Sequence, residues 1–185
     1  MNKESKTTIA NEESMESRLE QILNDALIKA TDTYSVPPQI IWVDNSTIAT
    51  LGNFSASTGK AKAKKTFNVS ALVAASLSNG TVLNYRACLP EGKRRILYVD
   101  TEQSRYHCHN VLARILKLAG LPTDMDNQNL DFIGLREYTP AIRMEVIDYA
   151  LAHNHGYGLV IIDGIRDLLL DINNAGESVE VINKM

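Results

Sequence analysis

One loop constrains the fold of this chain more than any other segment. The run Gly59-Lys60-Ala61-Lys62-Ala63-Lys64-Lys65-Thr66 fits the pattern G-x-x-x-x-G-K-[ST] except at Lys64, which stands where the second glycine belongs. A loop of this kind needs a strand before it and a helix after it. The apolar run from Ile48 to Phe54 predicts the strand. Phe67 to Leu77 predicts the helix, which ends before the stop signal Asn79-Gly80.

This loop pattern carries a definite chemistry. Successive backbone N–H groups surround phosphates, the lysine reaches the β and γ oxygens, and the Ser/Thr hydroxyl holds Mg²⁺. Lys65 and Thr66 take these roles here, so we expect ATP and Mg²⁺ as cofactors. The expected binding residues are Gly59, Lys60, Ala61, Lys62, Ala63, Lys64, Lys65, Thr66 and Phe67. A solvated basic loop is the alternative. Against it, no Asp or Glu occurs between residues 45 and 90, although acids outnumber bases in the whole chain.

Composition limits the remaining possibilities. The chain has 185 residues, of which 44% are hydrophobic and 22% charged, and this is typical of one globular domain. A net charge of −3 argues against a protein that coats nucleic acid generally. No apolar run approaches the length of about 18 residues that predicts a membrane span. The two cysteines, Cys88 and Cys108, form no disulfide framework, which indicates a cytoplasmic protein with free thiols.

The spacing of apolar residues divides the chain at the prolines Pro37 and Pro38. Residues 1–36 are expected to form a disordered polar tail of about ten residues, followed by an amphipathic helix over 12–30 that packs on the core or on a partner. Prolines disfavour helix in the residues before them, so the helix ends there. Residues 37–185 are expected to form the domain itself.

Strands and helices alternate along this second part. Arg95–Asp100 and Leu130–Leu135 are predicted strands, while Ser104–Leu118 and Pro140–His153 are predicted helices. The apolar run from Gly158 to Gly164 predicts a strand buried on both faces. This alternation predicts an α/β fold, with a mostly parallel sheet and helices on both faces.

Two carboxylates follow strands of the expected sheet. Ligands of such sheets sit outside the carboxyl ends of the strands, so these groups and the loop should converge. Asp163 would hold Mg²⁺ together with Thr66, whereas its alternative role is to cap the next turn. Glu102 would be the general base that deprotonates water, whereas its alternative role is a surface carboxylate at a helix start. The expected catalytic residues are therefore Glu102 and Lys65.

Three segments together resemble a known family. GKAKAKKT, ILYVDTEQS and LVIIDG, in this order, resemble the RecA-like P-loop ATPases, and among them the plasmid replicative helicases and mobilisation ATPases of mobile elements in gut bacteria. The resemblance covers residues 37–185. It implies that Glu102 is the catalytic base and that Asp163 binds the metal through water.

The resemblance also sets expectations for the whole protein. RecA-like cores continue with further strands, whereas this chain stops at Met185, after a segment from Gly176 that suggests the opening of a helix. We therefore expect a partial core that lacks its C-terminal part. The family implies a homo-oligomer whose neighbouring subunit completes each site, and an ATPase acting on single-stranded DNA in replication or mobilisation. One alternative is a nucleotide-dependent DNA-binding or regulatory module without turnover, and another is a small-molecule kinase.

Overall fold

The computed structural model describes residues 3–60 and 64–169. The chain divides into two compact units, Met1–Val36 and Pro37–Met185. The first unit contains helix α1, Lys3–Ala26. The helix begins earlier than predicted, so the expected disordered tail is helical from Lys3. It also ends four residues before the predicted end at residue 30. Lys, Glu and Ala favour helix, and no Gly or Pro interrupts the chain before Pro37.

The apolar stripe of α1 is exposed. Met15, Leu19 and Leu23 retain 57%, 57% and 67% of their accessible surface. One helix offers no second element within its own unit against which this stripe can be buried. Among the residues that the structure describes, no helix is both long enough and apolar enough to cross a membrane.

The second unit begins with a small antiparallel sheet of order β2-β1-β4-β3. Its strands are β1 Gln39–Val43, β2 Ser46–Thr50, β3 Thr81–Val82 and β4 Tyr85–Ala87. The sequence predicts a strand before the loop, but its expected place in the parallel sheet is wrong. β2 forms an antiparallel hairpin with β1 and, within residues 3–60 and 64–169, has no parallel partner. Asp44, with φ 51, and Asn45 provide the turn that allows this pairing. The parallel part of the fold is correspondingly smaller than expected.

A three-stranded parallel sheet follows, in the order β6-β5-β7. Strand β5, Arg95–Asp100, lies between β6, Leu130–Gly134, and β7, Tyr157–Asp163. The sequence predicts all three strands to within one residue at either end. Asp100 is in register with Asp163 on β7, so the two strands end at the same edge of the sheet.

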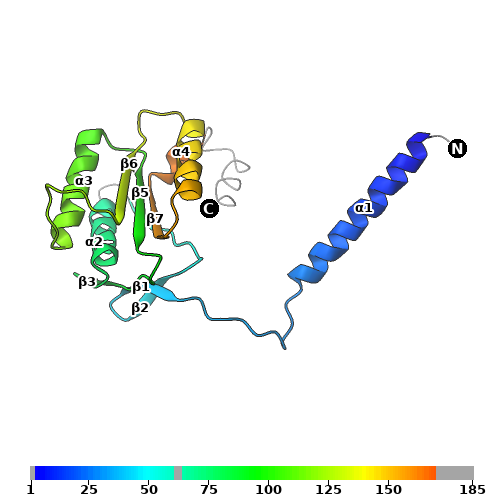
Figure 1. The fold of residues 1–185 in the computed structure, drawn as a ribbon, viewed down its shortest axis with the longest axis horizontal. Coiled ribbons are helices and arrows are strands. Elements are labelled where there is room, and N and C mark those ends of the chain that lie inside the picture. The colour runs from blue at the N-terminus through cyan, green and yellow to red at the C-terminus, as the bar shows by residue number, and fades with distance from the viewer. Residues whose placement is uncertain (1–2, 61–63, 170–185) are drawn as a thin grey trace. The chain divides into compact units, whose positions relative to one another are not determined.

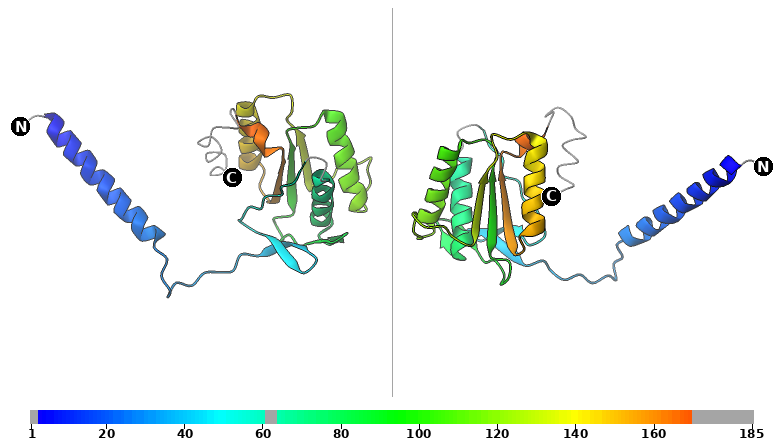
Figure 2. Two further views of the ribbon diagram at one scale, coloured as in Figure 1. Left: turned by 180° about the vertical axis from the view of Figure 1, so that it is seen from behind. Right: turned by 45° about the horizontal axis from the view of Figure 1, so that its top comes forward.

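Helices cover both faces of this sheet (Figures 1 and 2). Helix α2, Lys65–Ser78, and helix α3, Arg105–Leu118, pack together on one face. Helix α4, Pro140–His153, and the short 3-10 helix η1, Ile165–Leu168, lie together on the other. The α/β class expected from the sequence is confirmed, as are the predicted bounds of α4.

The core lies on either side of β5. Ile96 and Tyr98 belong to the cluster beneath α2 and α3, whereas Leu97 and Val99 belong to the cluster beneath α4. All four are at most 1% exposed. The sequence predicts double burial for β7 as well, and this is wrong. β7 lies at the edge of the described sheet, where Val160 is 38% exposed.

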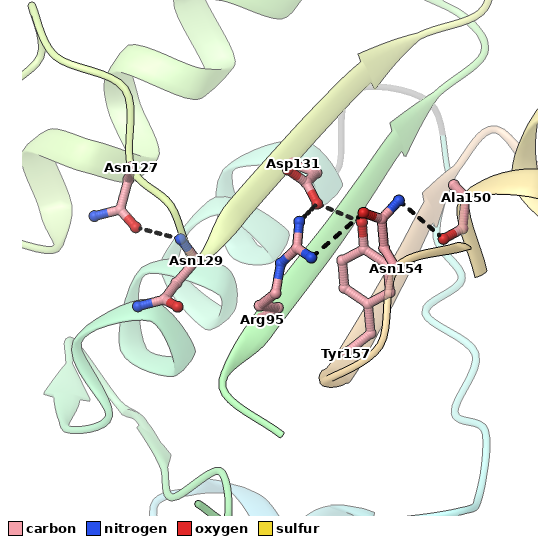
Figure 3. A network of polar contacts seen from close by, with 7 residues as sticks. All are labelled: Arg95, Asn127, Asn129, Asp131, Ala150, Asn154 and Tyr157. Carbon is pink, nitrogen blue, oxygen red and sulfur yellow. Dashed lines mark hydrogen bonds and ion pairs between the residues drawn. The ribbon is translucent and has the colours of Figure 1, made fainter. Parts of the chain in front are cut away.

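A polar network holds the three parallel strands together at their amino ends (Figure 3). The Arg95 guanidinium lies 2.5 Å from the Asp131 carboxylate. Tyr157 donates a hydrogen bond to the same carboxylate, and burial together with this bond raises the pKa of Tyr157 to about 12. Asn154 continues the network from Arg95 to Ala150 of α4. Arg95, Asp131 and Tyr157 come from β5, β6 and β7, so one carboxylate links all three strands.

Asp131→Ala is expected to lower the free energy of unfolding by about 1–2 kcal/mol, because it leaves Arg95 and Tyr157 without their shared acceptor. Chemical denaturation monitored by circular dichroism measures this change. Asp126→Ala removes an exposed carboxylate from the segment before β6 and serves as the control. Equal stability of the two variants would show that the network does not contribute.

Candidate active site

The loop meets α2 at Lys64. Lys64 is the N-terminal cap of the helix and adopts the left-handed conformation, with φ 56 and ψ 28. Its carbonyl oxygen accepts hydrogen bonds from the N–H groups of Phe67 at 3.0 Å and Asn68 at 3.1 Å. No acidic residue lies in the first turn of α2, so its N–H groups and its dipole favour an anion there.

The conformation of Lys64 explains why the loop pattern has glycine at this position. Glycine adopts the left-handed region without the Cβ clash that other residues suffer, which costs roughly 1 kcal/mol or more. Residue 64 therefore has the backbone conformation that a glycine would favour, although its side chain departs from the pattern.

Lys64→Gly is therefore expected to raise the free energy of unfolding by about 0.5–1 kcal/mol. Lys60→Gly is the matched control, because it removes the same charge from the same loop. Lys64 is one of four described non-glycine residues with positive φ, and Lys60 is not among them. Thermal unfolding compares the two variants, and an equal or lower midpoint for Lys64→Gly would contradict the expectation.

Thr66 and Asp163 come together, as the sequence predicts. The Thr66 hydroxyl in the first turn of α2 donates to Asp163 Oδ2 across 3.3 Å. Asp163 ends β7, and its Oδ2 also accepts a hydrogen bond of 3.0 Å from the Tyr98 hydroxyl. Within the described ranges, no group of three or more His, Cys, Asp or Glu is placed to hold a metal ion. The candidate metal donors are thus one hydroxyl and one carboxylate.

Glu102 follows β5 on a turn that Asp100 fixes. The Asp100 side chain is fully buried, and its Oδ1 accepts bonds from the N–H groups of Glu102 at 3.0 Å and Gln103 at 2.8 Å. The Gln103 amide donates to Oδ2 across 2.8 Å. A carboxylate that accepts several such bonds holds the backbone of the turn in one conformation. The position of Glu102 is therefore set by the strand before it.

Gly164 lets Glu102 lie close to the end of β7. A Cβ atom on Gly164 would lie 2.7 Å from Glu102 Cγ and would also collide with the Thr101 hydroxyl. Thr101 is buried and donates to the Gly164 carbonyl across 2.8 Å. Gly164 has φ +98, which glycine adopts without strain. The residue after Asp163 must therefore be small for Glu102 to lie beside the end of β7.

The charges around Glu102 alter its proton affinity. Glu102 is an exposed residue, but partial desolvation of its carboxylate raises its pKa, and the negative charges of Asp163, Asp167 and Asp100 raise the pKa further. The Lys65 ammonium group acts in the opposite direction and lowers this pKa. These are the surroundings of a carboxylate that accepts a proton more readily than an ordinary surface Glu.

Arg143 of α4 fixes the segments that leave β6 and β7. Its guanidinium donates to the carbonyl oxygens of Leu135 at 3.0 Å and Arg136 at 2.8 Å, which follow β6. It also donates to the carbonyl of Asp167 in η1 at 2.5 Å. Arg143 was not predicted from the sequence. The feature that could have indicated it is a cation within the otherwise apolar pattern of Ile142 and Val146.

The expected site residues thus fall into three groups. Thr66, Asp163 and Glu102 gather at one edge of the sheet, with Lys65 close enough to affect Glu102. Gly59 and Lys60 are exposed, as is Phe67 at 41%, and Lys64 caps α2. The expected contacts of Ala61, Lys62 and Ala63 lie outside the described residues, as does the predicted helix opening at Gly176. Asp100 and Thr101 belong to the strand end that was expected at the site, although no role was assigned to them. Tyr98 contributes to the site without having been predicted.

These features define a class of protein. A phosphate-loop sequence at the start of a helix, with its threonine beside the carboxylate that ends a parallel strand, is the arrangement of the P-loop nucleoside triphosphatases. The model of the AAA domain family matches residues 16–182, and the chain belongs to this family of P-loop ATPases. Comparison with curated proteins and with solved structures gave no match.

Proposed function

We propose that the protein binds ATP with Mg²⁺ at this edge of the sheet and hydrolyses it. The observation that carries the proposal is the 3.3 Å contact between Thr66 and Asp163, with Glu102 held on the turn after the neighbouring strand β5. The Thr66 hydroxyl and the Asp163 carboxylate are suitable metal ligands, and the Glu102 carboxylate is suitable for proton transfer. A binding protein without turnover would need only the first two.

The donor set fits a magnesium ion. Hydroxyl and carboxylate oxygens are the ligands that Mg²⁺ prefers, and this ion is usually held by few protein groups together with substrate phosphates. Thr66 would bind it directly, and Asp163 would bind it through water. When bound, Mg²⁺ neutralises negative charge that develops on the β and γ phosphates.

Each remaining residue has a role in this proposal. The Lys65 ammonium group, at the start of α2, pairs with phosphate oxygens and orients the γ-phosphate. Glu102 accepts a proton from the water that attacks the γ-phosphate in line with the leaving oxygen. Asp100 keeps the Glu102 backbone in place while the proton moves, because its carboxylate binds the N–H groups of that turn.

Phosphate release from ATP tests the proposal directly. The wild-type protein is expected to release phosphate from ATP when Mg²⁺ is present, and the release is expected to stop when EDTA is added. The nucleotide affinity measured by calorimetry should also decrease in EDTA. Metal-dependent binding without release would favour the regulatory alternative, and transfer to a sugar or nucleotide acceptor would favour the kinase alternative.

We further propose that ATP turnover in the full protein drives work on single-stranded DNA, in a homo-oligomer of the replicative-helicase or mobilisation type. The sequence resemblance motivates this, and one surface supports it. Arg105 at the start of α3 and Arg136 after β6 line one hollow beside Gln103, together with Ser104, Gly134 and Glu137. Two exposed cations next to the turn that carries Glu102 suit a phosphate backbone whose binding affects hydrolysis.

Single-stranded DNA added to the ATPase assay tests this finer proposal. We expect DNA to increase phosphate release and the double variant Arg105→Ala/Arg136→Ala to lose the increase while keeping its ATP affinity. Arg86→Ala is the control, because Arg86 lies on the antiparallel sheet over the Trp42 ring at 3.7 Å. Stimulation that survives in the double variant would place the DNA contact elsewhere. The homo-oligomer is tested separately, by measuring the molar mass of the protein with light scattering in the presence and absence of ATP.

A further inference from the structure

A buried tyrosine contacts the candidate metal carboxylate from beneath. Tyr98 lies on β5 opposite Ile161 of β7, two residues before Asp163, so both side chains are on the same face of the sheet. The Tyr98 hydroxyl donates to Asp163 Oδ2 across 3.0 Å, and Thr66 approaches the same oxygen from α2. One carboxylate oxygen is thus fixed by a strand and by a helix.

The position of the Tyr98 ring is itself well determined. Its side chain is fully buried, and its ring stacks on Phe132 of β6 with 4.4 Å between centroids and 8° between planes. A buried hydroxyl needs a partner, and Asp163 is that partner.

The surroundings of Tyr98 show that packing alone does not require the hydroxyl. The ring belongs to an apolar cluster with Ile96 and Ile115, where phenylalanine would fill the same space. Replacing the hydroxyl by hydrogen would leave a strand of purely apolar side chains from Ile96 to Val99. The hydroxyl is directed to Asp163, the carboxylate that the proposed function assigns to the metal.

We propose that Tyr98 is a positioning residue of the metal site. Its hydroxyl holds the Asp163 carboxylate in the orientation in which Oδ2 faces Thr66, so that the metal donors are arranged before nucleotide arrives. The inference rests on the proposed function, because it assigns Asp163 to Mg²⁺. Residues that orient metal-binding groups commonly affect metal affinity by about 10–100-fold.

Tyr98→Phe tests this role, because it removes one oxygen and keeps the ring and its stacking on Phe132. Calorimetric titration of Mg²⁺ into protein with a non-hydrolysable ATP analogue is expected to show an affinity about 10-fold weaker than wild type. Binding of the analogue in EDTA is expected to be unchanged. Tyr157→Phe is the matched control, since it removes a hydroxyl that binds the Asp131 carboxylate at the other end of the sheet.

A second comparison separates this role from a general effect on the fold. In an Asp163→Asn background, Tyr98→Phe is expected to cause no further loss of metal affinity, because it acts through that carboxylate. Phe132→Leu removes the stacked ring and keeps the hydroxyl, so its effect on metal affinity is expected to be smaller.

The outcomes distinguish this inference from the proposed function. If the wild-type protein shows no metal-dependent nucleotide binding, the proposed function fails. If it does, and Tyr98→Phe binds Mg²⁺ as wild type does, only the role of Tyr98 is overturned. Equal losses in Tyr98→Phe and Tyr157→Phe, or a loss that persists in the Asp163→Asn background, would overturn it as well.

Discussion

Glu102→Gln is expected to reduce ATP turnover by about 10²–10⁴-fold, the usual contribution of a general base, while ATP still binds. Glutamine keeps the size and polarity of the side chain but cannot accept the proton of the attacking water. The turn is unaffected, because Asp100 binds the backbone N–H of residue 102 and not its side chain. Single-turnover phosphate release gives the rate, and calorimetry gives the affinity.

Glu91→Gln is the control for this variant, since Glu91 is an exposed carboxylate in the turn before β5. We expect it to turn over ATP as wild type does. Turnover by Glu102→Gln within a factor of about two of wild type would assign the proton transfer to another group or to water.

The raised pKa of Glu102 gives this prediction a pH dependence. Turnover requires the ionised carboxylate, so the rate should fall as the pH drops through a value above the ordinary pKa of Glu. The raised pKa also makes the stability of the folded protein depend on pH. The folded protein holds this proton more tightly than the unfolded chain, so stability decreases as the pH rises from the ordinary pKa through the raised one.

Glu102→Gln removes this ionisation. Its unfolding midpoint, measured without nucleotide at neutral pH, is expected to exceed that of wild type by about 1–3 °C. The difference between the two proteins should shrink toward acidic pH. A midpoint below that of wild type at neutral pH would contradict the repulsion that we infer among Glu102, Asp163 and Asp167.

Lys65→Ala is expected to weaken ATP binding by about 10–100-fold, because a hydrogen bond to a charged group contributes about 1.5–3 kcal/mol. Lys65 begins α2, and the N-terminus of this helix also favours anions. The substitution removes the ammonium charge that pairs with the phosphates and leaves the contribution of the helix in place. Calorimetry with ATP and Mg²⁺ measures it. Lys93→Ala is the control, because it removes an exposed lysine outside the loop, before β5, and this variant should bind ATP within a few-fold of wild type. Equal affinities of Lys65→Ala and wild type would refute the assignment of the loop.

The sequence predicts the elements around β5 because local signals mark them. Pro140 opens α4, Gly120 follows the end of α3, and apolar runs mark β5 and β7. The hairpin of β1 and β2 was missed, since its pairing depends on contacts between strands and not on the residues of β2 alone. The burial of β7 was misjudged for the same reason. The runs that form β5 and β7 have similar apolar composition. In the described sheet β5 has a strand on each side, whereas β7 has one on one side only.

The candidate site was predicted through its strand ends. In a parallel sheet, residues that follow adjacent strands meet at one edge, and Asp163 and Glu102 do so. Tyr98 could not be recognised in this way, because a tyrosine within an apolar strand is typical of a core residue. Only the register of β5 with β7 shows that its hydroxyl reaches Asp163.

A crystal structure with a non-hydrolysable ATP analogue and Mg²⁺ tests the central claim most directly. We expect the triphosphate to lie at the start of α2, with Lys65 on its phosphate oxygens and the metal bound by Thr66 and, through water, by Asp163. Glu102 should lie within hydrogen-bond reach of a water beside the γ-phosphate. A nucleotide bound elsewhere on the chain, or a metal without contact to Thr66 or Asp163, would contradict this account.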